Sequence, residues 1–182
     1  MSIDFALLLI RVVVGGALAA HGAQKLFGWS GGPGLRGTAG FFGQALGMRH
    51  AGFWAFTGAL AEFGGGLLLA AGFLNPAGPL LLVAAMLVAI FKAHWSRGFW
   101  GTNGGYETAL VFLVVSLAIG FAGNGAYALD AAFGTALPEP AALVIGIVLA
   151  GLGAIAALVE ARPAPAALAQ RLGHAAPADR AA

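Results

Sequence analysis

The chain has 182 residues, of which 60% are apolar and 9% charged, with a formal net charge of +2 and a mean hydropathy of +0.89. Ordinary soluble domains carry about 25% charged residues, so this composition excludes a soluble fold and predicts an integral membrane protein. The nine basic residues are scattered along the chain, so we expect no nucleic-acid partner. The absence of cysteine excludes disulfides, thiol chemistry and cysteine-bound metals.

Apolar stretches long enough to cross a membrane, about 20 residues each, recur along the chain. They cover residues 5–27, 51–74, 78–95, 105–123 and 141–160. Asn75-Pro76 and Gly78-Pro79 predict a tight turn after the second stretch, because proline cannot continue a helix. We therefore expect one all-α domain over residues 1–160, a polytopic membrane helical bundle.

The segment 28–50 is more polar and rich in glycine. Its sequence predicts a short helix that lies in the membrane interface, with Phe41, Phe42 and Leu46 as its apolar contacts. A plain loop is the alternative for this segment.

Basic residues flank the first and third loops and recur in the last segment, at Lys25, Arg36, Arg49, Lys92, Arg97, Arg162, Arg171 and Arg180. Basic loops remain in the cytoplasm. We therefore expect a multi-pass protein of the bacterial plasma (inner) membrane, with its N-terminus outside and its C-terminus in the cytoplasm. The Ala/Pro-rich tail, 161–182, is expected to be disordered.

Glu62 lies in the middle of the second stretch, where a charged side chain costs about 2.5–3.5 kcal/mol. Its helix extends about 16 Å to either side, too far for the side chain to reach water. Glu62 is therefore expected to be protonated or paired with a cation inside the bundle.

The first stretch offers basic partners on one face. At 100° per residue, Arg11 and His21 each lie within about 40° of Lys25 on the helical wheel. Gly15 and Gly22 fall on the same face, where they would let another helix approach closely. This face is predicted to point into the bundle.

The third and fourth stretches complete the candidate set. Lys92 is near a helix end and can reach the interface, so His94 is the better inward candidate, and Glu107 opens the fourth stretch. The predicted intramembrane polar cluster consists of Arg11, His21, Lys25, Glu62, His94 and Glu107. The alternative is that Arg11–Glu62 and Lys25–Glu107 pairs lock the helices together and the histidines are core residues. Two histidines without a second pair give no support for haem or a metal site.

Three segments in a fixed order resemble the DoxX family of small bacterial membrane proteins: Arg11 followed by Gly22–Lys25, the run Glu62–Gly72 before Asn75-Pro76, and Met86–His94 leading to Asn103–Glu107. The resemblance covers roughly residues 5–130 and implies a four-helix membrane core, outside which the fifth stretch and the tail lie. It places Arg11, Lys25, Glu62, His94 and Glu107 on the family's recurring polar positions, with no catalytic mechanism that can be transferred to them.

The resemblance also implies a functional context, because the family name comes from subunits associated with quinone-linked sulfur oxidation. The leading hypothesis is a redox-associated subunit that binds a quinone or a similar amphipathic molecule in the polar cluster. With no intrinsic cofactor, it would receive electrons from a membrane or cytoplasmic oxidoreductase partner, and alone it is not expected to be an enzyme. A small proton-coupled transporter or a non-enzymatic scaffold is the alternative.

Overall fold

The computed structural model describes residues 3–160, and within this range the chain forms helices and no strands. The helices are α1 (Ile3–Phe27), α2 (Gly34–Gln44), α3 (Ala51–Ala71), α4 (Ala77–Val88), α5 (Glu107–Ala122), α6 (Leu129–Phe133) and α7 (Ala141–Glu160). A π-helical turn, Ala89–His94, and a 3₁₀ turn, Trp95–Arg97, extend α4 without a break. The predicted all-α helical bundle is therefore confirmed. The expectation of disorder for 161–182 lies outside the described residues.

Four helical segments among the described residues are long and apolar enough to cross a membrane: Ile3–Phe27, Ala51–Ala71, Ala77–Arg97 and Ala141–Glu160. The fourth predicted stretch corresponds to α5, which has 16 residues. At 1.5 Å per residue α5 is about 24 Å long, shorter than the hydrocarbon core of about 30 Å. It is short because Gly123, with a φ of 79°, ends the helix and turns the chain. The second predicted stretch also ends early, because Gly72 caps α3 with a φ of 65°.

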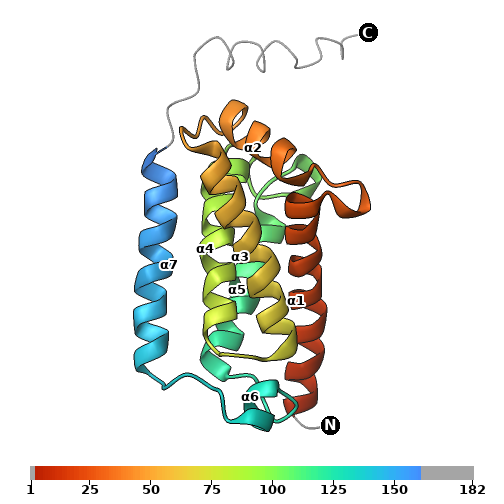
Figure 1. The fold of residues 1–182 in the computed structure, drawn as a ribbon, viewed down its shortest axis with the longest axis vertical. Coiled ribbons are helices and arrows are strands. Elements are labelled where there is room, and N and C mark those ends of the chain that lie inside the picture. The colour runs from red at the N-terminus through yellow and green to blue at the C-terminus, as the bar shows by residue number, and fades with distance from the viewer. Residues whose placement is uncertain (1–2, 161–182) are drawn as a thin grey trace.

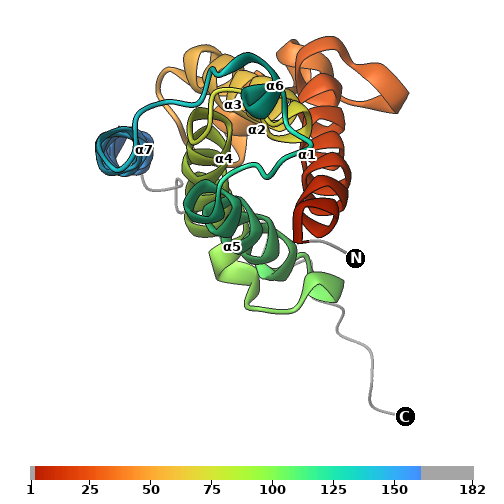
Figure 2. The ribbon, with the colours of Figure 1, turned by 90° about the horizontal axis from the view of Figure 1, so that it is seen from below.

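The helices stand side by side, and α1 packs along α3 (Figures 1 and 2). α4 packs against α3, α5 packs against α4, and α7 stands on the outer side of α4. α2 crosses one end of the bundle and packs on α3 and α1. The short helix predicted within segment 28–50 is therefore present, and its position in the membrane interface stays a prediction. α6 and the N-terminus of α1 lie at the opposite end.

The contact between α1 and α3 depends on glycine. A Cβ atom added at Gly15 would lie 2.6 Å from both Ala70 N and Gly66 O, so only glycine fits there. Gly22 meets the backbone of Phe63 in the same way. The predicted inward face of α1 is buried against α3 at Gly15 and Gly22. His21, which was assigned to the same face, is exposed.

The core behind this interface is aliphatic, while the outer faces of the helices expose large apolar side chains to the surrounding medium. The buried cluster consists of Leu18, Leu69, Leu82, Met86, Ile90, Ala109 and Ile119. Exposed residues on the outer faces include Leu9, Val13, Leu60, Leu67, Val148, Leu152 and Ile155. An apolar exterior of this kind is suited to lipid and not to water.

Arg11 ties α1 to the end of α3. Its side chain is fully buried, and it donates hydrogen bonds to Ala70 O and Tyr127 O, each at 3.0 Å. Arg11 does not pair with Glu62, which corrects one pairing considered from the sequence. The reason is distance along α1: Arg11 lies about 21 Å before Lys25, and Glu62 lies beside Lys25.

Asp130 closes the same end of the bundle. Its carboxylate accepts hydrogen bonds from Leu74 N at 2.8 Å, Asn75 N at 2.9 Å, Asn124 Nδ2 at 2.9 Å and Thr135 Oγ1 at 2.7 Å. Burial by itself would raise the pKa of Asp130, but these four hydrogen bonds stabilise the carboxylate and lower its pKa below the ordinary value. The charge therefore holds the α3–α4 turn and the segment around α6 together.

Substituting Asp130 by Asn tests this role. We expect a loss of about 3 kcal/mol in the free energy of unfolding at pH 7, because each hydrogen bond to a charged group contributes about 1.5–3 kcal/mol. Since the folded pKa is lowered, the stabilisation is complete above the unfolded value of about 3.9 and is lost as the pH falls through the folded pKa. Asp130→Asn should abolish this pH-dependent part of the free energy of unfolding.

Thermal unfolding in detergent between neutral and acid pH measures both effects, with Glu139→Gln as the control. Identical unfolding curves for Asp130→Asn and wild type would contradict the role assigned to Asp130.

Candidate functional site: an intramembrane cavity

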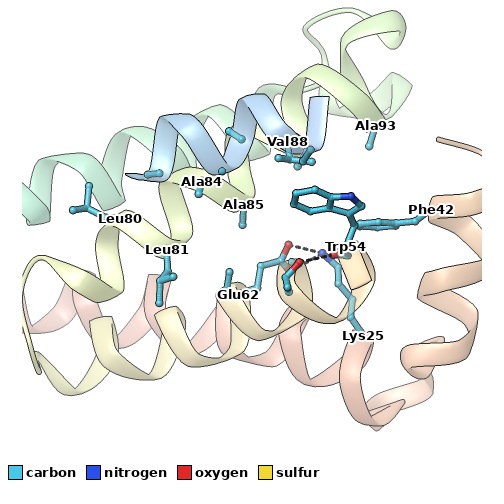
Figure 3. A pocket seen from close by; sticks show the side chains of 18 of the residues that line it. Lys25, Phe42, Trp54, Glu62, Leu80, Leu81, Ala84, Ala85, Val88 and Ala93 are labelled. Carbon is cyan, nitrogen blue, oxygen red and sulfur yellow. Dashed lines mark hydrogen bonds and ion pairs between the residues drawn. The ribbon is translucent and has the colours of Figure 1, made fainter. Parts of the chain in front are cut away.

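A cavity of about 1080 Å³ lies between α3, α4 and α7 and is covered at one end by α2 (Figure 3). Small-molecule sites in proteins occupy about 300–1000 Å³, so this cavity is large enough for a molecule with a headgroup and a tail. Its walls are mostly apolar. Representative lining residues are Phe42 on α2, Gly58 and Ala61 on α3, Leu81, Ala85 and Val88 on α4, and Leu149 and Gly153 on α7.

An ion pair forms the polar part of the cavity wall. Lys25 Nζ donates to Glu62 Oε1 at 2.5 Å and to Oε2 at 2.6 Å (Figure 3). The Glu62 side chain is 6% exposed and the Lys25 side chain is 33% exposed. Of the two states expected for Glu62, the structure therefore has the paired one. Because an ammonium group has three donors, Lys25 keeps one N–H for a further partner.

The pairing follows from how the two helices run. Lys25 is in the last turn of α1, and Glu62 is in the middle of α3, which packs against α1. α2 is held over the pair by Thr38, whose hydroxyl lies 3.2 Å from Lys25 O and 2.8 Å from Gly34 O. α2 therefore lies beside the ion pair and contributes Gly37, Thr38 and Phe41 to the same cavity wall.

His94 and Arg97 line the same cavity from the end of α4. His94 Nδ1–H donates to Gly104 O at 2.7 Å, which leaves Nε2 available to a ligand. The π-helical turn Ala89–His94 does not advance by 100° per residue, so the helical wheel used for the sequence prediction does not hold there. Lys92 does not line the cavity. Basic and titratable side chains therefore gather at the end of the cavity that α2 covers.

The structure brings together three of the six sequence-predicted residues, since Lys25, Glu62 and His94 line one cavity and the other three do not. Arg11 binds backbone carbonyls at the far end of the bundle. His21 is on an exposed face of α1.

Glu107 has a different partner from the one considered. It accepts a hydrogen bond from Gly101 N at 2.8 Å and does not pair with Lys25. Glu107 lies in the first turn of α5, where a negative charge also interacts favourably with the helix dipole. The Lys25–Glu107 pairing is therefore wrong, because α5 packs on α4 and places Glu107 away from the end of α1.

The sequence reasoning missed the wall that α7 provides. Gly146, Ala150, Gly153, Ala154 and Ala157 line the cavity from that helix. Their spacing marks one face of a helix in small residues, which is a signal that close packing or a cavity is present on that side. Within residues 3–160 no group of three His, Asp or Glu side chains is placed to hold a metal ion.

The fold and the site define the class of protein: an all-α, multi-pass membrane bundle with a polar pair in an apolar cavity. Residues 6–95, about half of the chain, match the DoxX family, and the chain belongs to that family. The match includes Lys25, Glu62 and His94, whereas α5 and α7 lie beyond it. No curated protein and no solved structure matches the chain.

Removing either partner of the ion pair is expected to have unequal effects. Lys25→Gln leaves the more buried charge, Glu62, without a partner, and should lower the free energy of unfolding by about 3 kcal/mol, the lower end for a broken buried pair. Glu62→Gln should cost less, because the more exposed Lys25 can reach water. The double variant should recover part of the loss, which a double-mutant cycle measured by unfolding in detergent would quantify. Strictly additive losses would show that the two side chains do not interact.

Proposed function

We propose that this DoxX protein is a redox-associated membrane subunit that binds a quinone or a similar small amphipathic molecule in the cavity. The observation that carries the proposal is one polar pair, Lys25–Glu62, on the wall of a cavity that is otherwise mostly apolar. A molecule with a polar headgroup and an apolar tail matches this division. The headgroup would lie against Lys25, and the tail would lie along α4 and α7.

The donors available fit the carbonyl oxygens of a quinone. Lys25 keeps one N–H after its two contacts with Glu62, and the Arg97 side chain reaches the same cavity. Reduction of a quinone to a quinol takes two electrons and two protons. Glu62 and His94 both line the cavity and would pass protons to the headgroup.

The electrons would come from a partner, because the chain has no cysteine and therefore no thiol couple of its own. An oxidoreductase in the membrane or the cytoplasm fits this role. We also propose that the α2 end faces the cytoplasm of a bacterial plasma membrane. Lys25, Arg36, Arg49, Lys92 and Arg97 all belong to the helix ends and loops on that side, as basic residues on the cytoplasmic side do in other membrane proteins.

The proposal is tested on the full chain purified in mild detergent. Its bound small molecules are extracted and identified by mass spectrometry, and we expect a stoichiometric quinone or related amphiphile. Glu62→Gln should lose most of it, because Lys25 is then no longer held in place. Glu107→Gln is the matched control, since Glu107 does not line the cavity.

A second variant separates lost binding from a weakened fold. Gly58→Leu narrows the cavity without changing charge; a Cβ there meets no atom closer than Phe42 at 4.0 Å. Gly64→Leu, on the same helix, faces open space and serves as its control. Bulk lipid alone in the wild-type extract would contradict the proposal. Proton-gradient-dependent uptake of a solute into vesicles, abolished by Glu62→Gln, would instead favour a transporter.

A further inference from the structure

We infer that the cavity is loaded sideways from the hydrocarbon core of the bilayer, through a slot between α3 and α7, and that its ligand is therefore a tail-bearing, membrane-dissolved molecule. This inference rests on the proposed function and adds to it the route and the chemical class of the ligand. It separates such a ligand from a water-soluble solute.

The two long walls of the cavity do not pack on each other along their length. α7 packs against α4, and α3 packs against α1, α2 and α4. α3 meets α7 near one end, where the Glu160 carboxylate contacts His50 and Trp54. In both views of the bundle, α7 stands beside α4 and apart from α1 (Figures 1 and 2).

Several side chains on the facing sides of these walls are too small to fill the space between them. α3 presents Gly58 and Ala61 to the cavity. The buried side of α7 consists of Ala150, Ala154 and Ala157, which leaves the cavity open beside them. The slot is therefore a consequence of sequence, because larger residues at these positions would fill it.

Gly153 is on the edge of α7 that borders the slot. It continues the row of Ile145 and Leu149, which line the cavity although they are 59% and 62% exposed. Residues that are both exposed and part of the cavity wall mark its opening. A Cβ added at Gly153 would meet no atom within 4 Å, so a side chain there would extend into this opening without disturbing the helix.

The two ends of the cavity are covered by protein. At one end Phe41 and Phe42 of α2 and Leu46, just after it, form the wall. At the other end the segment before α7 folds across, with Leu137 N donating to Asn75 O at 3.1 Å. Leu137 itself lines the cavity. The long side between α3 and α7 is thus the open one.

The slot opens at the depth of lipid tails. On the α7 edge of the slot, Ile145 and Leu149 are exposed, and the outer faces of both helices expose further apolar side chains, among them Leu60 on α3 and Leu152 on α7. These apolar residues would contact acyl chains in a membrane. A molecule that enters through the slot must first dissolve in the bilayer, and a headgroup without a tail dissolves there poorly.

The experiment uses the full chain in phosphatidylcholine vesicles and a benzoquinone that bears a short alkyl tail. Trp29, Trp95 and Trp100 are replaced by Phe, so that quenching of Trp54, which lines the cavity, reports loading. We expect Gly153→Phe to slow loading by about tenfold or more, since overpacking a passage adds a barrier of this size. Gly151→Phe, two residues away and outside the cavity wall, should load at the wild-type rate.

The outcomes separate the route from the function. If Gly153→Phe loads at the wild-type rate, and Gly58→Leu on the α3 edge does so too, the lateral route is overturned. Quinone binding is left intact by this outcome. Equal displacement of the tailed probe by the same benzoquinone without its tail would overturn the requirement for a tail. If the tailed probe does not quench Trp54 in the wild-type protein and no amphiphile is extracted from it, the proposed function itself fails.

Discussion

The arrangement of this protein depends on the cost of placing a carboxylate in the middle of a membrane helix. Glu62 is too far from either end of α3 to reach water, so a cation must come to it. Lys25 provides that cation from the last turn of α1. The two helices can approach closely enough for this contact because Gly15, Gly22 and Gly66 remove the side chains between them.

The charged residues of the bundle fall into two groups that differ in how completely they are satisfied. Arg11 and Asp130, at one end, are buried and bind mainly backbone groups and short polar side chains, and their role is to hold helices and turns together. Lys25, at the other end, is one-third exposed and lines a cavity. A charge that is paired yet still accessible is able to bind a ligand. The structure therefore separates charges that are buried within the fold from a charge that stays accessible in the cavity, although all of them lie in or beside apolar helices.

Much of the fold was predictable from the sequence, because hydrophobic length, the turn at Asn75-Pro76 and the small residues on α1 each have a direct physical meaning. The need of Glu62 for a partner was predictable from the cost of its charge. The identity of that partner was not, since Arg11 and Lys25 lie on the same face of α1. The choice between them depends on the register of α1 against α3, which is set by backbone contacts at Gly15 and Gly66 that no helical wheel contains.

The cavity was not predictable for a related reason. Its walls are mainly alanine, glycine and aliphatic residues, and these have the same pattern whether they pack tightly or leave a space. The π-helical turn before His94 and the early end of α5 at Gly123 also depend on tertiary packing and backbone conformation. In addition, α7 lies outside the matched family region, so the resemblance gave no expectation for the wall that it forms.

The central claim is that Lys25, held by Glu62, is the headgroup end of an amphiphile site. Lys25 and Lys92 are the only lysines in the sequence, so Lys92→Arg leaves one ¹⁵Nζ signal in protein labelled on lysine nitrogen. Solid-state NMR in lipid, with ¹³C-labelled glutamate, then measures whether this nitrogen is coupled to a carboxylate carbon and whether its signal moves when a tailed quinone is added. Our account predicts a strong coupling that Glu62→Gln removes and a shift on loading. A Lys25 signal with no carboxylate neighbour, or one that the quinone leaves unchanged, would contradict it.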